Sequence, residues 1–192
     1  MQICLYGASS DNIARIYIEK TEELGAALAA AGHTMVYGGG GAGLMGAAAR
    51  GFKAENGRVI GVVPRFLKVD GILYENCDEM LYTDTMRERK QIMEERAEGF
   101  IVTPGGIGTY EEFFEIYTLK QLGRHGKPIV IYNINGYYDD MLSMLQRTVH
   151  EGFMREKSLS LITVADTPRR VLEQLERADG TTVDFRTTKF VR

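Results

Sequence analysis

The segment TPGGIGTYEE, residues 103–112, combines residue types that could bind an anion with residue types that could act on a sugar. Its glycines lie between the apolar run FIVT and a helical pattern. Gly105, Gly106 and Gly108 allow successive backbone N–H groups to face one point, and a helix N-terminus adds unpaired N–H groups of its own. Thr109 is predicted to cap the helix and to add a hydroxyl. Because the loop is too short to wrap a triphosphate and carries no lysine, it predicts a monophosphate site.

Two glutamates, Glu111 and Glu112, follow at once and are predicted to lie in the first turn of the helix. One acidic residue there ordinarily complements the helix dipole. A carboxylate beside an anion site repels the ligand unless it faces another part of it, such as a ribose hydroxyl or the positive charge of a ribose ring during glycosidic cleavage. We therefore predict that these carboxylates face the sugar, at a ribose hydroxyl or at the charge that develops on the ribose ring; the residues alone do not say which glutamate does which.

Arg89 is the candidate partner of these glutamates. A helical pattern from about Asp84 to Glu98 has an apolar stripe that includes Met86 and Met93, and Arg89 falls on the same stripe. A charge that faces the core is costly unless it is paired. Two interpretations stay open: a structural salt bridge, or a contact with a ligand or a carboxylate inside the pocket, which we prefer.

Another glycine-rich segment, YGGGGAGLMG at residues 37–46, follows an earlier predicted strand. We call residues 37–46 the first glycine loop and residues 104–109 the second glycine loop. The first satisfies the dinucleotide pattern G-x-G-x-x-G in two registers, but no acidic residue closes the next strand, and a Walker loop is excluded because there is no G-K-[ST]. This loop either touches the ligand directly, through Gly39 and Gly40, or only shapes the pocket.

The elements that position these loops are short apolar strands that alternate with helices. The predicted strands are QICLYG, HTMVY, RVIGVVP, EMLYT, FIVT, PIVIYNI and SLITVA. The predicted helices span about residues 13–31, 44–56, 84–98, 110–123, 141–153 and 167–178. This alternation predicts an α/β fold with a mainly parallel sheet, in which ligands bind beyond the carboxyl ends of the strands. We predict one domain over residues 1–180 and a C-terminal tail over residues 181–192.

Composition excludes several other classes of protein. A net charge of −3 gives no electrostatic reason to expect nucleic acid or an anionic membrane as a partner. No apolar run has the length of a transmembrane helix, and the start lacks the pattern of a signal peptide. The two cysteines and three histidines form no disulfide framework and no metal motif by spacing. We predict a cytoplasmic protein with no metal and no cofactor.

Three segments, YGGGGAGLMG, MRERK and PGGIGTYEE, resemble the signatures of the Lonely Guy (LOG) family of cytokinin riboside 5′-monophosphate phosphoribohydrolases, of which many relatives were labelled lysine decarboxylases. The similarity extends from ICLYGASS to about LEQLE. It implies a Rossmann-like, three-layer α/β/α homodimer that hydrolyses the N-glycosidic bond of a nucleoside 5′-monophosphate. It also implies that Arg89 and Glu112 are the catalytic pair.

The resemblance, together with the loops, gives a set of candidate substrate-binding residues. They are Gly39, Gly40, Glu75, Met86, Lys90, Gly105, Gly106, Ile107, Gly108, Thr109, Glu111 and Thr118. Plant members have a substrate-binding glutamate after the third strand; the position that matches it without gaps is Gly71, so Glu75 is the candidate substitute.

Three functions stay open at this point. The leading hypothesis is a phosphoribohydrolase that acts on AMP or N6-substituted AMP. The second is a broader purine or pyrimidine nucleotide 5′-monophosphate nucleosidase, and the third is a non-catalytic carrier of a nucleotide or of molybdenum cofactor. Tyr137 and Tyr138, in the segment NGYYDD, fit turn packing, a dimer contact or a pocket wall.

Overall fold

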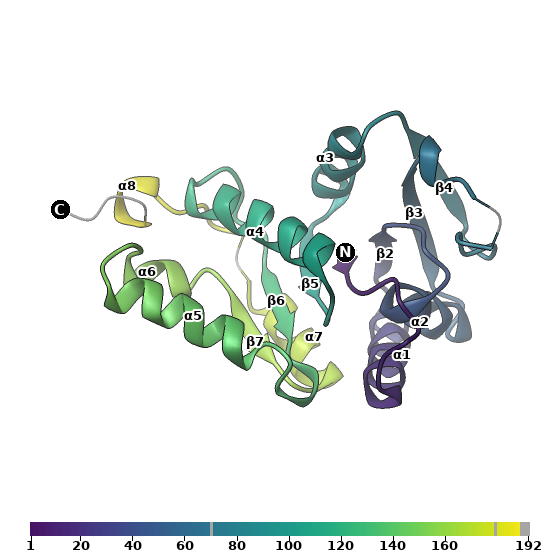
Figure 1. Cartoon of the computed structure of the whole chain (residues 1–192), viewed down its shortest axis with the longest axis horizontal. Coiled ribbons are helices and arrows are strands. Elements are labelled where there is room, and N and C mark those ends of the chain that lie inside the picture. Colours follow the sequence, from purple (N-terminus) through teal and green to yellow (C-terminus); the bar gives the residue numbers. More distant parts are fainter. Residues whose placement is uncertain (70, 179, 189–192) are drawn as a thin grey trace.

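The computed structural model describes residues 1–69, 71–178 and 180–188. In this part of the chain seven strands form one sheet, in the order β4-β3-β2-β1-β5-β6-β7, and every neighbouring pair is parallel (Figure 1). The strands are β1 (Gln2–Tyr6), β2 (Thr34–Tyr37), β3 (Arg58–Pro64), β4 (Glu79–Thr83), β5 (Gly99–Val102), β6 (Ile129–Tyr132) and β7 (Thr163–Ala165).

Helices cover both faces of this sheet. One face packs against α1 (Arg15–Ala30), α2 (Gly43–Ala54) and α7 (Pro168–Glu176). The other packs against α3 (Met86–Arg96), α4 (Ile107–Gln121), α5 (Asp139–His150) and α6 (Glu156–Leu159). Short 3-10 turns η1 (Arg65–Leu67) and η2 (Ile134–Gly136) follow β3 and β6, and α8 (Phe185–Thr188) ends the described chain. The predicted Rossmann-like, three-layer α/β/α fold is therefore confirmed.

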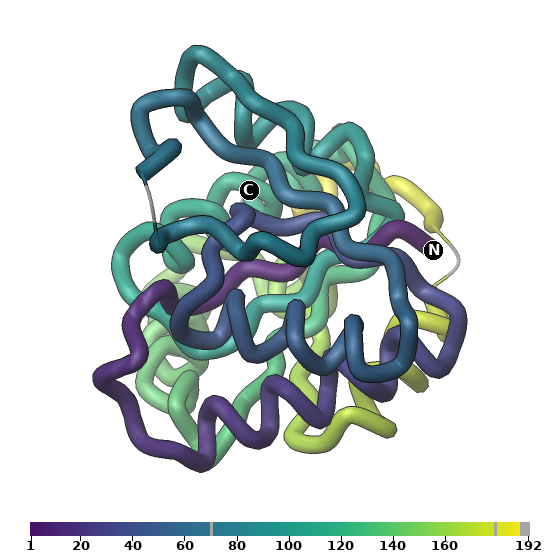
Figure 2. Tube along the Cα trace, turned by 90° about the vertical axis from the view of Figure 1, so that its right-hand side faces the viewer, coloured from purple at the N-terminus to yellow at the C-terminus, as the bar shows by residue number. Residues whose placement is uncertain are grey.

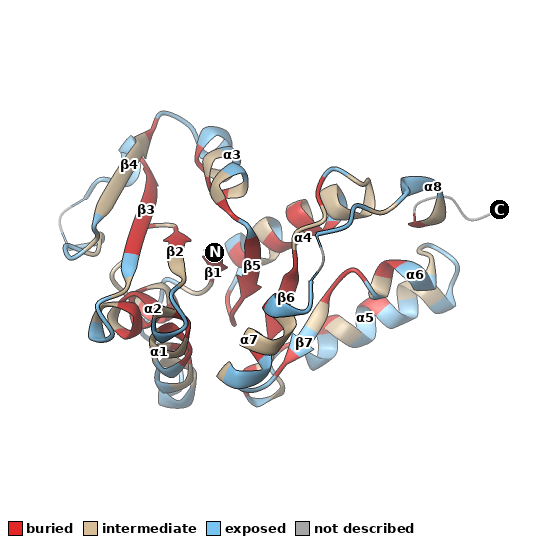
Figure 3. Cartoon of the chain, turned by 180° about the vertical axis from the view of Figure 1, so that it is seen from behind, coloured by how far each residue is buried: buried red, intermediate tan, exposed pale blue. Residues whose placement is uncertain are grey.

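The core consists of two apolar layers, one on each side of the sheet. Phe100 of β5 and Phe113 of α4 belong to one layer, and Leu24 of α1 and Phe52 of α2 belong to the other. Figure 3 shows the inner strands buried along their length, while the outer sides of α1, α5 and α6 are exposed. A parallel strand covered on both faces has to be apolar throughout, which explains why the strands are continuous apolar runs in the sequence.

Helices α1 and α2 lie side by side along the same face, as the trace in Figure 2 shows. Arg50 of α2 also forms an ion pair with Glu22 of α1, with 3.4 Å between Nε and Oε2. This packing holds the start of α2 close to the loop that leaves β1.

The order of strands creates a crevice beyond the carboxyl end of β1. From β1 the chain builds β2, β3 and β4 on one side, and then returns to place β5, β6 and β7 on the other side. The loops after β1 and β5 therefore run in opposite directions, which is the arrangement that opens a ligand site in α/β sheets.

The start of α4 corrects the predicted element boundaries. The helix begins at Ile107, three residues before the predicted start, and its N-cap is the extended residue Gly106. Thr109 therefore lies inside the first turn and is not the cap. Glu111 and Glu112 fall in the second turn, and the first turn holds no acidic residue.

Part of the predicted C-terminal tail packs onto the rest of the chain. The hydroxyl of Thr188 donates to the carbonyl of Gln121 at 2.6 Å, and Ser158 donates to the carbonyl of Thr188 at 3.0 Å. Residues 189–192 of the predicted tail lie outside the described residues. The division into a domain of 1–180 and a tail of 181–192 stays a prediction.

In the described chain, no helix combines the length and the apolar character that crossing a membrane requires. Likewise, no group of three or more His, Cys, Asp or Glu side chains in the described residues is arranged to hold a metal ion.

Candidate active site

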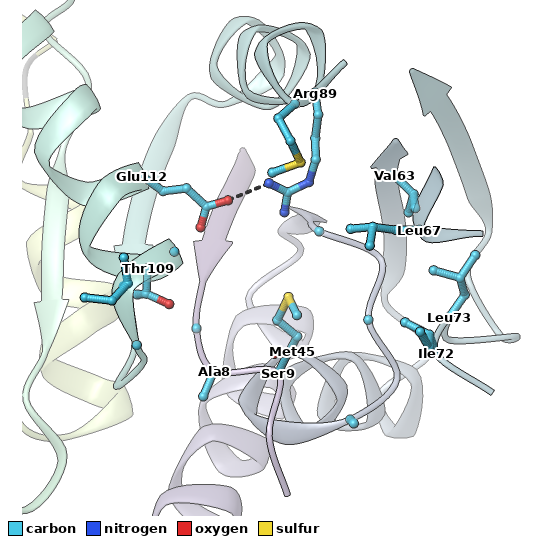
Figure 4. A pocket seen from close by; sticks show the side chains of 18 of the residues that line it. Ala8, Ser9, Met45, Val63, Leu67, Ile72, Leu73, Arg89, Thr109 and Glu112 are labelled. Atoms are coloured by element: carbon cyan, nitrogen blue, oxygen red, sulfur yellow. Dashed lines mark hydrogen bonds and ion pairs between the residues drawn. The ribbon is translucent and has the colours of Figure 1, made fainter. Parts of the chain in front are cut away.

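A cavity of about 700 Å³ occupies the crevice at the carboxyl end of the sheet. Its lining comes from the ends of β1, β2, β3 and β5 with the loops that follow them, and from α2, α3 and α4. The lining residues are Gly7, Ala8, Ser9, Gly38, Gly40, Ala42, Met45, Val63, Leu67, Gly71, Ile72, Leu73, Met86, Arg89, Gly106, Ile107, Gly108, Thr109, Glu111 and Glu112. Figure 4 shows Thr109 and Glu112 on one wall and the aliphatic side chains of Val63, Leu67, Ile72 and Leu73 on the opposite wall.

The second glycine loop presents backbone N–H groups that have no partner. Within the described chain, the amides of Gly106, Ile107, Gly108 and Thr109 donate no hydrogen bond, and no side chain caps α4. Gly106, Ile107 and Gly108 are also exposed. An exposed helix N-terminus with free N–H groups attracts an anion through its dipole and its donors.

Gly106 and Gly108 have no protein atom within 4 Å of the position that a Cβ would take. Neither residue has a positive φ, so the backbone does not require glycine. Gly108 lies inside the helix, where glycine costs up to about 1 kcal/mol relative to alanine, whereas glycine is well suited to the N-cap position of Gly106. The space that their missing side chains leave is open toward the cavity, as expected if a ligand approaches the backbone there.

Gly105 has a different role, because the protein itself fills the space beside it. A Cβ there would lie 2.1 Å from Oγ1 of Thr109. The buried Thr109 side chain therefore packs back over Gly105, and this contact fixes the bend that starts the helix.

The first glycine loop lines the cavity, and the helix that follows it has no free N-terminus. The start of α2 is already capped: the carboxylate of Asp11 accepts from the amide of Gly43 at 2.7 Å, and the carbonyl of Ala8 accepts from Leu44 and Met45. Because these donors are used, the start of α2 does not offer the free amides that the start of α4 does. The same contact shows that Asp11, in the loop after β1, caps α2.

Gly38 of the first glycine loop makes room for a charged side chain. A Cβ at Gly38 would lie 2.3 Å from Nη2 of Arg89, so the guanidinium lies directly against the backbone at the end of β2. The glycine is therefore required for the position of Arg89.

Arg89 and Glu112 form an ion pair at the back of the cavity. Nη1 of Arg89 donates to Oε1 of Glu112 at 2.7 Å, and Nε donates to the carbonyl of Val62 at 3.2 Å (Figure 4). The side chains are only 9% and 11% exposed, respectively. The ion pair predicted for Arg89 is thus present, and it joins α3 to α4.

The protonation of Glu112 reflects two opposing effects. Burial raises the pKa of the Glu112 carboxyl above its ordinary value, while the positive charge of Arg89 lowers it; the net shift is upward. Glu111 raises this pKa further and Lys90 lowers it. The environment of Glu112 therefore makes its ionisation sensitive to the charges around it.

Lys90 binds the neighbouring glutamates and does not line the cavity. Its Nζ forms an ion pair with Glu111 and a second one, at 2.8 Å, with Glu115 one turn further along α4. These carboxylates raise the pKa of Lys90 against the opposing effect of its burial. The lysine thereby holds Glu111, which does line the cavity, in a fixed position.

The predicted substrate-binding residues divide into two groups. Nine of the predicted site residues line the cavity: Gly40, Met86, Arg89, Gly106, Ile107, Gly108, Thr109, Glu111 and Glu112. Five do not: Gly39, Glu75, Lys90, Gly105 and Thr118. Gly39 is buried behind Val63, and Thr118 faces outward from α4. Glu75, the candidate substitute, is exposed outside the cavity, whereas Gly71 lies in its wall.

Part of the wall was not predicted from the sequence: Gly7, Ala8 and Ser9 after β1, and Leu67, Ile72 and Leu73 after β3. Residues 7–9 lie at the carboxyl end of a predicted strand. Because ligands in α/β sheets bind beyond the carboxyl ends of the strands, these residues could have been predicted. The residues after β3 carry no periodic pattern, and no local signal identifies them.

An open parallel sheet with a free helix N-terminus and a buried ion pair at its switch point defines a Rossmann-like protein with a site for a small anionic ligand. Residues 45–175 match the profile of the family described as "Possible lysine decarboxylase". The cytokinin riboside 5′-monophosphate phosphoribohydrolase of Mycobacterium tuberculosis is 38% identical over 88% of this chain and 90% of its own length. The probable enzyme LOGL2 of Oryza sativa subsp. japonica is 38% identical over 91% of this chain and 72% of its own. The chain therefore belongs to the LOG family.

A solved structure of similar fold is the molybdenum cofactor carrier protein of Chlamydomonas reinhardtii. It superposes with a TM-score of 0.69, at 20% identity, over 92% of this chain and 96% of that one. At this identity the likeness concerns the fold alone.

Proposed function

We propose that this protein is a hydrolase that cleaves the N-glycosidic bond of adenosine 5′-monophosphate or an N6-substituted derivative. The products are the free base and ribose 5-phosphate. One observation carries the proposal: the free N-terminus of α4 and the buried Arg89–Glu112 pair line the same cavity. The names of the relatives agree with this activity.

The second glycine loop binds the 5′-phosphate in this account. The phosphate does not react, so its binding energy serves to place the ribose against the catalytic groups. Four free amides at residues 106–109 supply charge-assisted hydrogen bonds, and the helix dipole adds to them.

Glu112 acts at the sugar. As the C1′–N bond breaks, its electron pair leaves with the base and positive charge develops on the ribose ring. The ionised carboxylate of Glu112 stabilises this charge and receives the proton of the water that adds to C1′. The departing base takes up a proton from solvent to become neutral, and Glu112 then returns the proton of the water to solvent, so that one water molecule is consumed in all. Arg89 keeps Glu112 ionised and oriented, since it opposes the effect of burial on the pKa of Glu112.

The aliphatic wall binds the base. Val63, Leu67, Ile72 and Leu73 face the polar wall across the cavity, with Met45 between them (Figure 4). A flat purine and an apolar N6 substituent fit such surroundings better than a charged group does. In this account the base is held by shape and apolar contact.

The decarboxylase activity in the family's description has no support in this site. Pyridoxal-dependent decarboxylation needs a lysine that forms a Schiff base. No lysine is present among the described residues that line the cavity, and Lys90 is engaged with Glu111 and Glu115.

The test of the proposal is release of base by the purified protein. AMP, isopentenyladenosine monophosphate and CMP are compared with their unphosphorylated ribosides. We expect turnover of a purine monophosphate and little turnover of its riboside; equal rates on CMP would favour the broader nucleosidase.

Glu112→Gln should abolish turnover while phosphate-dependent binding persists, whereas Glu95→Gln, on the exposed side of α3, should leave the rate unchanged. Binding of AMP without release of base by the wild type would favour the carrier hypothesis.

We further infer that the protein works as a homodimer in the cytoplasm, without a nucleic acid or membrane partner. Two free cysteines, Cys4 and Cys77, suit a reducing compartment, and the net charge of −3 does not favour polyanions. Light scattering after gel filtration measures the assembly, and a mass of one chain would refute the dimer.

A further inference from the structure

The loop after β6 carries the two tyrosines of NGYYDD, and its own hydrogen bonds hold it in one shape. Asn135 and Gly136, in the 3-10 turn η2, both adopt positive φ, at 52° and 71°. The side chain of Asn133 then accepts from the amide of Tyr138 at 2.7 Å and donates to the carboxylate of Asp139 at 2.7 Å. The two tyrosine side chains therefore project from a turn whose backbone is held in place.

Both tyrosine hydroxyls donate to the backbone of the neighbouring loop after β5. Tyr138 donates to the carbonyl of Thr103 at 2.7 Å, and Tyr137 donates to the carbonyl of Gly105 at 2.7 Å. The carbonyl between them, that of Pro104, accepts from the amide of Ala8 at 3.0 Å. Three successive carbonyls of the chain that enters the second glycine loop are thus bound.

Binding a carbonyl also fixes the N–H group of the next residue. In a planar trans peptide the C=O of one residue and the N–H of the following residue point in opposite directions. No peptide bond in the described chain is cis. The bond from Tyr137 to the carbonyl of Gly105 therefore sets the direction of the Gly106 amide, which is the first of the four free donors. Without this bond the peptide between two glycines would rotate readily.

The rings themselves are held independently of the hydroxyls. Tyr138 is fully buried and packs edge-on against Tyr110, with 5.9 Å between ring centroids. Tyr137 packs edge-on against Tyr138 at 5.0 Å and against Tyr17 at 5.9 Å. A Tyr→Phe substitution at either position removes one donor and leaves the ring packing in place.

We propose that Tyr137 is a positioning residue for the phosphate site: its hydroxyl orients the peptide between Gly105 and Gly106 so that the Gly106 amide faces the anion. Tyr138 anchors the same loop one peptide earlier. This inference rests on the proposed function, and it gives NGYYDD a role in phosphate binding.

The experiment measures binding of inorganic phosphate by calorimetry and steady-state kinetics with AMP for the wild type, Tyr137→Phe and Tyr117→Phe. Tyr117 is the matched control, because its hydroxyl also donates to a backbone carbonyl, that of Ser158 at 2.9 Å, but on the far half of α4. Tyr137→Phe should raise the Kd for phosphate and the KM for AMP by about threefold to tenfold, with kcat within about twofold, because one net hydrogen bond is lost. Tyr117→Phe should leave both constants unchanged even where it lowers Tm.

Unchanged phosphate binding and KM in a folded Tyr137→Phe protein would overturn this inference and leave the proposed function standing. The same holds if kcat falls and KM does not change. If the wild type itself neither binds phosphate nor releases base, the proposed function fails, and the inference fails with it. Because Tyr137 is 39% exposed, the phenylalanine variant is expected to fold, and circular dichroism verifies this.

Discussion

Gly108→Ala should make the protein more stable and less able to bind its substrate. Gly108 is the second residue of α4, and alanine there improves helix propensity by up to about 1 kcal/mol. No protein atom lies within 4 Å of the added methyl group, so nothing offsets this gain. For a chain of 192 residues, 1 kcal/mol corresponds to about 2–4 °C in Tm. We therefore expect Tm to rise by about 1–4 °C.

The same methyl group enters the space that we assign to the phosphate. Loss of one hydrogen bond to a charged group costs about 1.5–3 kcal/mol, which corresponds to about a 10-fold to 150-fold increase in KM. The assay compares kcat/KM for AMP and for adenosine, alongside thermal denaturation. The kcat/KM for AMP should fall, whereas the kcat/KM for adenosine should not change, since adenosine has no phosphate. A more stable variant with unchanged KM for AMP would refute our placement of the phosphate at α4.

Three further predictions concern the ion pairs. Gly38→Ala would place a Cβ 2.3 Å from the Arg89 guanidinium and displace it. Loss of one hydrogen bond between charged groups costs about 1.5–3 kcal/mol, so kcat, measured from initial rates, should fall at least tenfold. Because burial raises the pKa of Glu112, the folded state holds that proton more tightly than the unfolded state. The stability from Glu112 is therefore complete below its ordinary pKa of 4.5 and is lost as pH rises through the raised value. Glu112→Gln should lack this slope, so its Tm relative to wild type should increase from pH 4.5 to pH 7; a constant difference would contradict the assignment. Lys90→Met removes a charge that lowers the pKa of Glu112 and frees the carboxylate of Glu111, which raises it. The acid limb of the kcat/KM profile should move to higher pH, and an unmoved limb would contradict the coupling.

Much of the fold follows from local patterns in the sequence. The alternation of apolar runs and helical segments predicts the seven strands and the parallel sheet, because each buried strand is apolar on both faces. The pairing of Arg89 was also predictable, since its position on an apolar stripe requires a partner. These features depend on spacing within one segment.

Features that depend on contacts between distant segments were not predictable in the same way. By residue type Thr109 is as good an N-cap as Gly106, and glycine at 108 disfavours helix, so the pattern predicts a start of α4 that is three residues late, and Thr109 and the two glutamates shift with it. The capping of α2 by Asp11 joins residues 32 apart. The requirement for Gly38 arises only because Arg89, from a helix far along the chain, lies against it.

The central claim is that α4 binds a phosphate while Glu112 faces the sugar. The most direct measurement is a crystal structure of Glu112→Gln with AMP bound. The account predicts phosphate oxygens within hydrogen-bond distance of the amides at residues 106–109, and C1′ on the side of residue 112. A phosphate bound elsewhere in the cavity, or a ribose turned away from that side chain, would contradict it.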